Sequence, residues 1–310
     1  MRGTREQIHL PSGHSFRVLR WTHGLRDVES VLAPGRVARI VGEGAHWHYH
    51  IEMELTLFIS GEGIRFVGDN IGPFAAGDVV LLGEKLPHYW HARGPSSGLS
   101  VQWSFPHGHA FWAFPELFAC AGLFRKAGRG IRYTGRTAAL IHSALHELAA
   151  SSGADRLGLL LRLLDRLESA PESDQKSLSS SSFVLKGAER HQQAMRDVVR
   201  YLLANFRDEI RLPDVLRLAR MSKPTFARQF KKHSGKTFSD FLTHIRLQDA
   251  CRELAGTGRS VLDISLSSGF SHVSFFNRVF RRIMRRSPRE YRRMANRRRK
   301  APAVSGGNRK

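Results

Sequence analysis

The spacing of hydrophobic residues changes at about residue 110. Residues 10–105 hold short runs of branched and aromatic residues, such as ELTLFIS at 54–60, which Gly and Pro interrupt. Such runs predict β-strands, and their number favours a sandwich or barrel over 1–110. From 111 to 170 Leu recurs at helical spacing, as at Leu157, Leu160, Leu161 and Leu164, which predicts amphipathic helices. This Leu stripe suits either a core or a dimer interface.

A stretch rich in Ser, Pro and charged residues divides the chain at 171–190 and predicts an interdomain linker. Helical periodicity returns over 191–294. The basic, polar residues 295–310 predict a disordered tail. We therefore expect an α+β protein with a β-barrel, following helices and an all-α C-terminal domain.

The C-terminal domain contains a repeated phrase. RMSKPTFARQFKKHSGKTF at 220–238 returns as SGFSHVSFFNRVFRRIMRRSP at 268–288, with Phe226 and Phe230 matched by Phe276 and Phe280. Each copy follows an apolar helical stretch and a tight turn, so the pattern predicts two helix-turn-helix motifs. Because residues four apart share a helix face, each Phe pair is expected to be buried. The opposite faces carry Arg228 and Arg278.

The positive charge of the chain lies mainly in the same domain. Residues 191–310 hold 28 Lys and Arg against 9 Asp and Glu, whereas residues 1–190 hold 21 against 18. This asymmetry indicates a polyanionic partner for one domain only. Between the two copies, the helical pattern of 237–254 spans roughly 27 Å, so with its flanks it can hold two reading helices about one DNA turn apart. We expect double-stranded DNA to be the partner.

Residues 195–294 resemble the tandem helix-turn-helix domain of the AraC/XylS family of bacterial transcription regulators, above all in SVLDISLSSGFSHVSFFNRVFRRIMRRSPREYRR at 260–293. Arg285 stands where that family usually has Gly. The resemblance implies base-contacting residues in both copies, whereas the basic residues that follow are expected to meet phosphates. The implied base contacts are Lys223, Pro224, Thr225, Ala227, Arg228, His272, Val273, Ser274, Asn277 and Arg278; the phosphate contacts are Lys231, Lys232, Arg281 and Arg282.

A second constellation lies in GEGAHWHYHIEMELTLFISG at 42–61. Even-numbered side chains of one strand share a face, which would gather His46, His48, His50, Glu52 and Glu54. Imidazoles and carboxylates on one face suit either a divalent metal or a hydroxylated ligand.

The same stretch resembles the first cupin motif, from Gly42 through His48, His50 and Glu54 to Gly61, and His88 lies in a partial second motif. Barrels of this kind precede the DNA-binding domain in sugar-responsive members of the AraC family. The resemblance implies an effector pocket lined by His48, His50, Glu54, His88 and Trp90. A metal site at His48, His50, Glu54 and His88, or a packing role alone, are the other interpretations. Trp47, Trp90 and Trp103 are candidates for stacking on a sugar ring or for the core.

The leading hypothesis is a DNA-binding transcription regulator without enzymatic activity. It is controlled by a sugar-like effector and requires no cofactor. The resemblance further implies a homodimer, a bacterial cytoplasmic location at the nucleoid when DNA-bound, and RNA polymerase as partner of an activator. The alternatives are a metal-dependent cupin enzyme fused to a DNA-binding domain and a regulator without a small ligand. Cys120 and Cys251 do not form a disulfide framework, and no segment predicts a signal peptide, a membrane span or membrane binding.

Overall fold

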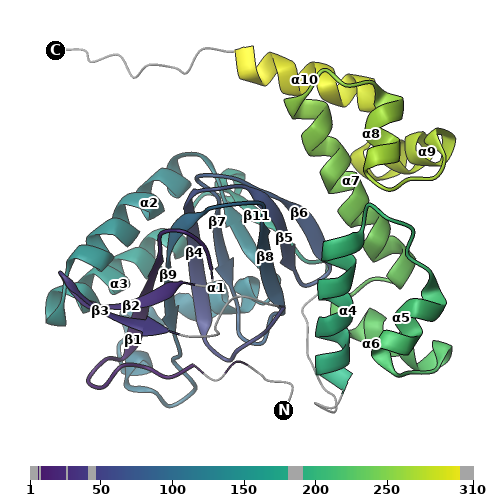
Figure 1. Ribbon diagram of the computed structural model, residues 1–310. Helices are drawn as coiled ribbons and strands as arrows, with labels where there is room; N and C mark the ends of the chain where they lie inside the picture. The colour runs from purple at the N-terminus through teal and green to yellow at the C-terminus, as the bar shows by residue number, and fades with distance from the viewer. Residues whose placement is uncertain (1–5, 7, 26, 41–46, 181–190, 301–310) are drawn as a thin grey trace.

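The computed structural model describes residues 6, 8–25, 27–40, 47–180 and 191–300. Figure 1 shows a β-rich N-terminal part with helices across one face, and a helical C-terminal part beside it. The expected α+β fold is therefore confirmed. His46 of the predicted histidine face lies outside the described residues.

The N-terminal part, which we call the barrel, consists of two antiparallel sheets. The larger sheet has the strand order β11-β10-β7-β4-β9-β1-β2-β3, and the smaller has β6-β5-β8. On β4, Leu55 and Leu57 point to the helices, whereas Glu54, Thr56 and Phe58 point between the sheets. The strands are β1 Phe16–Trp21, β2 Val28–Ala33, β3 Arg36–Ile40, β4 Met53–Ser60, β5 Gly63–Val67, β6 Asn70–Phe74, β7 Val79–Leu82, β8 His88–Ala92, β9 Ser97–Trp103, β10 Ile131–Tyr133 and β11 Gln175–Ser177.

Three helices, α1 Cys120–Ala127, α2 Gly135–Ala150 and α3 Gly153–Glu168, cover the outer face of the larger sheet. Leu160 and Leu164 of the predicted stripe are buried in this core, while Leu157 is exposed. Most of the stripe thus packs inside its own chain, because the apolar sheet face needs a cover. Dimerisation through these helices stays a prediction.

Two boundaries differ from the prediction. The region 111–170, predicted to be helical, contains strand β10, and the predicted linker 171–190 begins with a 3-10 turn at Glu172–Asp174 and strand β11, which pairs with β10. Three-residue strands are too short to give a clear alternation, so the sequence pattern did not reveal them. Residues 181–190 lie outside the described residues.

The C-terminal part contains two helix-turn-helix units joined by a long helix. Helices α4 to α6 form the first unit, α7 is the joining helix, α8 and α9 form the second unit, and α10 packs against α7 and α9. Their bounds are α4 Gln192–Asn205, α5 Leu212–Ala219, α6 Lys223–Ser234, α7 Phe238–Gly256, α8 Val261–Ser267, α9 Val273–Met284 and α10 Pro288–Lys300. The helical structure thus continues past the predicted boundary at 294, and residues 301–310 lie outside the described residues.

The barrel and the first helix-turn-helix unit share a hydrophobic core. Phe66 of β5 stacks on Phe241 of α7 at a centroid distance of 5.6 Å, and Trp47 packs against both Phe241 and His233. The amide of Gln248 donates to the backbone carbonyl of Ile71 at 3.3 Å. The two domains therefore dock directly.

Two smaller sequence predictions can be compared with the structure. Cys120 and Cys251 are buried free thiols, and burial raises the pKa of the Cys251 thiol to about 12. The thiolate, which is the reactive form, is therefore disfavoured at neutral pH. Within the described ranges, none of the helices has the length and apolar character that crossing a bilayer requires.

We expect His233, buried in the shared core, to make folding stability depend on pH. Burial, together with the charge of Arg196, lowers the pKa of His233 from 6.5 to about 4. Between these values the unfolded chain binds a proton that the folded chain does not, so stability falls as pH falls through this window. From pH 7 to pH 5 the loss from this residue is about 2 kcal/mol.

Urea unfolding of the wild type and of His233→Phe at both pH values measures this contribution. Phe keeps a ring against Trp47 and does not titrate, so the variant should lose about 2 kcal/mol less than the wild type over the same step. Equal losses in the two proteins would contradict the assignment to His233.

Candidate functional site

Helix α6, the first of the two predicted reading helices, is fixed by its aromatic face. Phe226 and Phe230 are 1% and 0% exposed, with ring centroids 5.3 Å apart, and both contact Phe238. Pro224 lies in the first turn, where its missing N–H costs no intrahelical bond. Ser222 precedes the helix in an extended conformation, but its hydroxyl donates to the Thr225 hydroxyl rather than accepting from the backbone.

Helix α9, the second predicted reading helix, repeats this construction. Phe276 and Phe280 are fully buried with ring centroids again 5.3 Å apart, and Phe280 contacts Tyr291 of α10. The helix ends at Arg285, whose φ of 57° lies in the left-handed region. Gly adopts this conformation at little cost, whereas the Arg side chain makes it less favourable.

The structure exposes nearly all the predicted DNA contacts on the faces opposite the Phe pairs. Thr225 and Val273 are the exceptions, because both are half-buried. The guanidinium of Arg278 lies 5.5 Å from the ring of exposed Phe275, which orients it along the helix surface. The exposed residues are Lys223, Pro224, Ala227, Arg228, Lys231, Lys232, His272, Ser274, Asn277, Arg278, Arg281 and Arg282.

The second unit and α10 also offer basic residues that the sequence did not predict as contacts. A cleft of about 1130 Å³ is lined by residues of α8, α9 and α10, and Arg285, Arg289 and Arg292 face it together with the predicted Arg278. Arg292 is positioned by donating to the backbone carbonyl of Arg259. The sequence pattern does not give the position of α10 relative to α9, and it therefore predicts no role for these arginines.

Short polar motifs start helices α8 and α10. The Ser260 hydroxyl accepts from the backbone N–H of Asp263 at 3.0 Å, which caps α8. At α10, Ser287 and Glu290 exchange such bonds, since the Ser287 N–H donates to the Glu290 carboxylate at 2.7 Å and the Glu290 N–H donates to the Ser287 hydroxyl. These are capping interactions that a sequence specifies locally.

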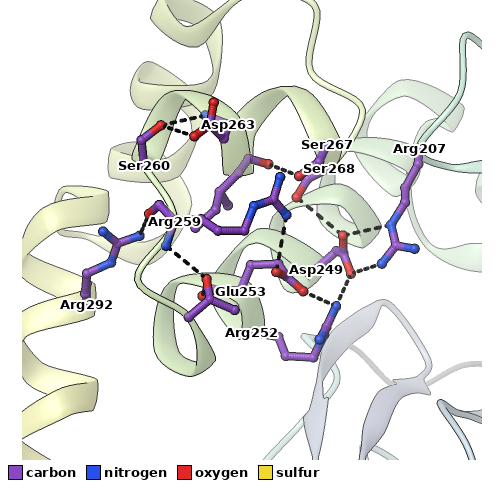
Figure 2. Close-up of polar contacts among 12 residues, drawn as sticks. Arg207, Asp249, Arg252, Glu253, Arg259, Ser260, Asp263, Ser267, Ser268 and Arg292 are labelled. Atoms are coloured by element: carbon purple, nitrogen blue, oxygen red, sulfur yellow. Dashed lines mark hydrogen bonds and ion pairs between the residues drawn. The ribbon is translucent and has the colours of Figure 1, made fainter.

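Helix α7 holds the two units at a fixed separation. Its 19 residues span roughly 28 Å, and its buried side chains belong to the cores of both units. Figure 2 shows Asp249 of α7 facing Arg207, Arg252 and Ser268. Asp249 also pairs with Arg93 of the barrel at 3.1 Å, so one buried carboxylate joins both units and the barrel.

The predicted histidines do meet inside the barrel. His48 and His88 exchange backbone hydrogen bonds of 3.2 and 2.9 Å, and their ring centroids lie 4.3 Å apart. The His50 ring lies 5.0 Å from that of His88, and one nitrogen of each of the three rings lies within 4.8 Å of the others. Strand β4 begins only at Met53, so a bend at 51–52, rather than a continuous strand, brings the histidines beside Glu54.

Glu54 is the acceptor at the centre of the group. Its carboxylate receives hydrogen bonds from His50 Nε2 at 3.0 Å, from Gln102 Nε2 at 2.5 Å and from the Thr56 hydroxyl. Burial would raise the pKa of Glu54, but these bonds and the nearby imidazoles hold it well below its ordinary value. Burial would likewise lower the pKa of His50, but the hydrogen bond and charge of Glu54 raise it. In the absence of a metal ion, the two form a buried ion pair.

The cavity beside Glu54 is small and partly apolar. Its volume is about 40 Å³, and Glu6 lines it with a carboxylate oxygen 3.0 Å from His48 Nε2. Trp90 lines the cavity as predicted, together with Trp21, which the sequence reasoning missed. Trp47 and Trp103 do not, because Trp47 packs on the first helix-turn-helix unit and Trp103 on the helices behind the larger sheet.

Comparison with known proteins concerns mainly the C-terminal domain. A family model described as a helix-turn-helix domain matches residues 215–294. The regulatory protein PocR of Salmonella typhimurium is 29% identical over 147 residues, 47% of this chain and 48% of PocR, so the match spans about half of that relative. The transcriptional activator RhaS of Pectobacterium carotovorum is 23% identical over 80% of this chain and 88% of its own.

A solved structure, a regulator with an AraC-type DNA-binding domain from Chromobacterium violaceum, is 27% identical and covers 34% of this chain and 93% of its own, with a TM-score of 0.32. The sequence matches agree with the paired helix-turn-helix units and with the residues that carried the resemblance. The chain is thus similar to transcriptional regulators of the AraC/XylS type, and residues 215–294 form the helix-turn-helix domain that it shares with them.

Proposed function

We propose that the protein regulates transcription by inserting α6 and α9 into neighbouring major-groove segments of one DNA duplex. The observation that carries this proposal is the matched construction of the two helices, each anchored by a buried Phe pair and each presenting a basic exposed face. Two such faces on one rigid joining helix are the arrangement by which tandem units read adjacent grooves. Docking of the barrel leaves both faces exposed.

The exposed residues divide into two roles. Those in the first turns of α6 and α9, with Arg228 and Arg278, are proposed to contact base edges. The cationic pairs Lys231–Lys232 and Arg281–Arg282 follow toward the helix ends and are proposed to bind phosphates, which supplies affinity without sequence preference.

The barrel is proposed to bind the effector at His48, His50, Glu54, His88 and Trp90. A sugar-like molecule needs a pocket of some hundreds of Å³, whereas the cavity holds about 40 Å³ with Glu6 in it. A sugar would therefore enter only after Glu6 leaves. Homodimerisation through α2 and α3, and activation through RNA polymerase, follow from the family resemblance and belong to the same proposal.

The cavity size also bears on the enzyme alternative. A catalytic metal keeps an open coordination position with room for its substrate. The cavity beside the histidines has room for about one water molecule. This small size favours a sensing role of the barrel over a catalytic role.

Footprinting of the purified full-length protein on DNA upstream of its own coding sequence tests the DNA-binding proposal. We expect protection of two adjacent major-groove segments about 10 base pairs apart. An affinity that is equal for all DNA sequences at every salt concentration would contradict it.

A further inference from the structure

We propose that the histidine cluster of the barrel binds a divalent transition-metal ion and that this ion is the signal to which the DNA-binding domain responds. The proposal rests on the DNA-binding function proposed above and assigns its signal to a metal ion in place of the sugar-like effector. It also identifies the part of the barrel through which the DNA-binding domain senses the ion.

The rings of His50 and His88 are oriented as metal-binding imidazoles are. Nδ1 of His50 lies 3.0 Å from the backbone carbonyl of Glu52, and Nδ1 of His88 lies 2.8 Å from that of Leu86. A nitrogen facing a carbonyl carries the proton, so each ring can offer Nε2 as a ligand atom. Such a bond from the second nitrogen to a carbonyl is the usual support of a metal-ligating histidine.

The imidazole nitrogens and the carboxylate oxygen at the centre of the histidine cluster require a cation between them. His50 Nε2 lies 3.0 Å and His88 Nε2 3.8 Å from the same carboxylate oxygen of Glu54. A nitrogen lone pair and a carboxylate repel unless a proton or a metal ion lies between them. His88 Nε2 is buried and has no hydrogen-bond partner among the described residues, which a metal ion would supply.

Further side chains of the barrel can supply metal ligands or hold them in position. His48 Nε2 faces the cluster beside a carboxylate oxygen of Glu6, and Gln102 and Thr56 hold the Glu54 carboxylate in place. Three imidazoles with one or two carboxylates suit Zn²⁺, Co²⁺, Ni²⁺ or Fe²⁺ rather than Mg²⁺ or Ca²⁺, which prefer oxygen ligands. The small cavity suits an ion with little space for another ligand.

The wall that carries these ligands is also the docking surface of the DNA-binding domain. Along the extended backbone, His48 points into the barrel and the adjacent Trp47 points outward, where it lies 5.5 Å from the His233 ring and 6.3 Å from that of Phe241. On the paired strand, Tyr89 follows His88 and stacks on Phe66, which in turn stacks on Phe241. A shift of His48 or His88 toward an ion therefore moves the residues on which α6 and α7 rest.

Binding is tested on the full-length protein after chelator treatment, by adding Co²⁺ and then Zn²⁺. We expect about one tightly held ion per chain and a Co²⁺ absorption spectrum typical of nitrogen and oxygen ligands, which Zn²⁺ removes. His88→Gln, a neutral variant of similar size, should weaken binding at least tenfold, whereas His142→Ala, which removes an exposed histidine of α2 from its pair with His146, should not. The absence of a stoichiometric ion in the wild type would overturn the metal proposal and leave the DNA-binding proposal standing.

Signalling is tested by measuring DNA affinity with and without Zn²⁺. In the wild type we expect the ion to change affinity by about 5- to 150-fold, the range of ordinary allosteric coupling. Trp47→Ala should bind Zn²⁺ but lose most of this change, whereas Trp112→Ala, a half-buried tryptophan outside the docking surface, should keep it. An ion that binds without altering DNA affinity in the wild type would overturn the signal, and equal changes in both variants would overturn the role of Trp47.

Discussion

Replacing Asp249 by Ala should lower the free energy of unfolding by about 3 kcal/mol, because several arginines lose one buried partner. The Asp249 carboxylate is fully buried and lies 2.9 Å from Arg207, 3.1 Å from Arg93 and 3.2 Å from Arg252. Figure 2 shows Arg207 and Arg252 on separate elements around this carboxylate, and of the three arginines Arg252 also pairs with Glu253. The arginines are partly exposed and can gain water, which places the effect at the lower end of the range for broken buried pairs.

Urea unfolding followed by circular dichroism measures this loss at neutral pH. Asp27→Ala is the matched control, since it removes an exposed carboxylate whose ion pair with Arg39 lies at the surface and should cost well under about 1 kcal/mol. Arg93→Ala separates the barrel contact from the others and should cost less than Asp249→Ala. A loss below about 1 kcal/mol for Asp249→Ala would mean that the arginines find other partners.

The two helix-turn-helix units could be predicted because the sequence pattern that specifies each of them is local and occurs twice. Phe226 and Phe230 repeat at Phe276 and Phe280 with a helical spacing, and that spacing alone decides which face is buried and which carries Arg228 or Arg278. Helix geometry then predicted the length of the joining helix. The fold of the C-terminal domain follows from patterns that need no knowledge of distant contacts.

The barrel site was predictable in its residues but not in its geometry. Alternation along the chain gathered His48, His50 and Glu54, yet a bend at 51–52 brings them together, and His88 joins through a backbone bridge from another strand. Glu6 comes from a part of the chain without any hydrophobic or polar pattern that indicates a site. Its approach to His48 depends on the closed barrel, which only the folded structure reveals.

Domain docking had no local signal at all. Arg93 follows β8 and Asp249 lies on α7, and neither residue belongs to a motif. A buried Asp in an amphipathic helix appears in the sequence as a polar residue of the solvent face, because periodicity does not register partners. For the same reason the sequence predicts sugar stacking or a core position for Trp47 but not its place in the core that the barrel shares with the first unit.

Removing the two arginines of the reading faces should have the largest effect on DNA binding. Arg228→Ala and Arg278→Ala should each cost about 1–3 kcal/mol of binding free energy and relax specificity at particular base pairs, as expected when an arginine contacts a guanine edge. Both side chains are exposed, so the stability of the folded chain should change little. The measurement is binding of each variant to the footprinted site and to its single-base substitutions at fixed salt.

Because the joining helix keeps the two arginines far apart, the double variant should lose about the sum of the single losses. Lys232→Ala is the informative comparison, since loss of a phosphate contact should weaken binding to all sequences alike and reduce the salt slope by about one. Arg36→Ala, an exposed arginine of the barrel, controls for the change of net charge and should bind as the wild type does. If Arg228→Ala and Arg278→Ala weakened all sequences equally, the two faces would bind only the DNA backbone, and sequence reading would have to come from the remaining residues of α6 and α9.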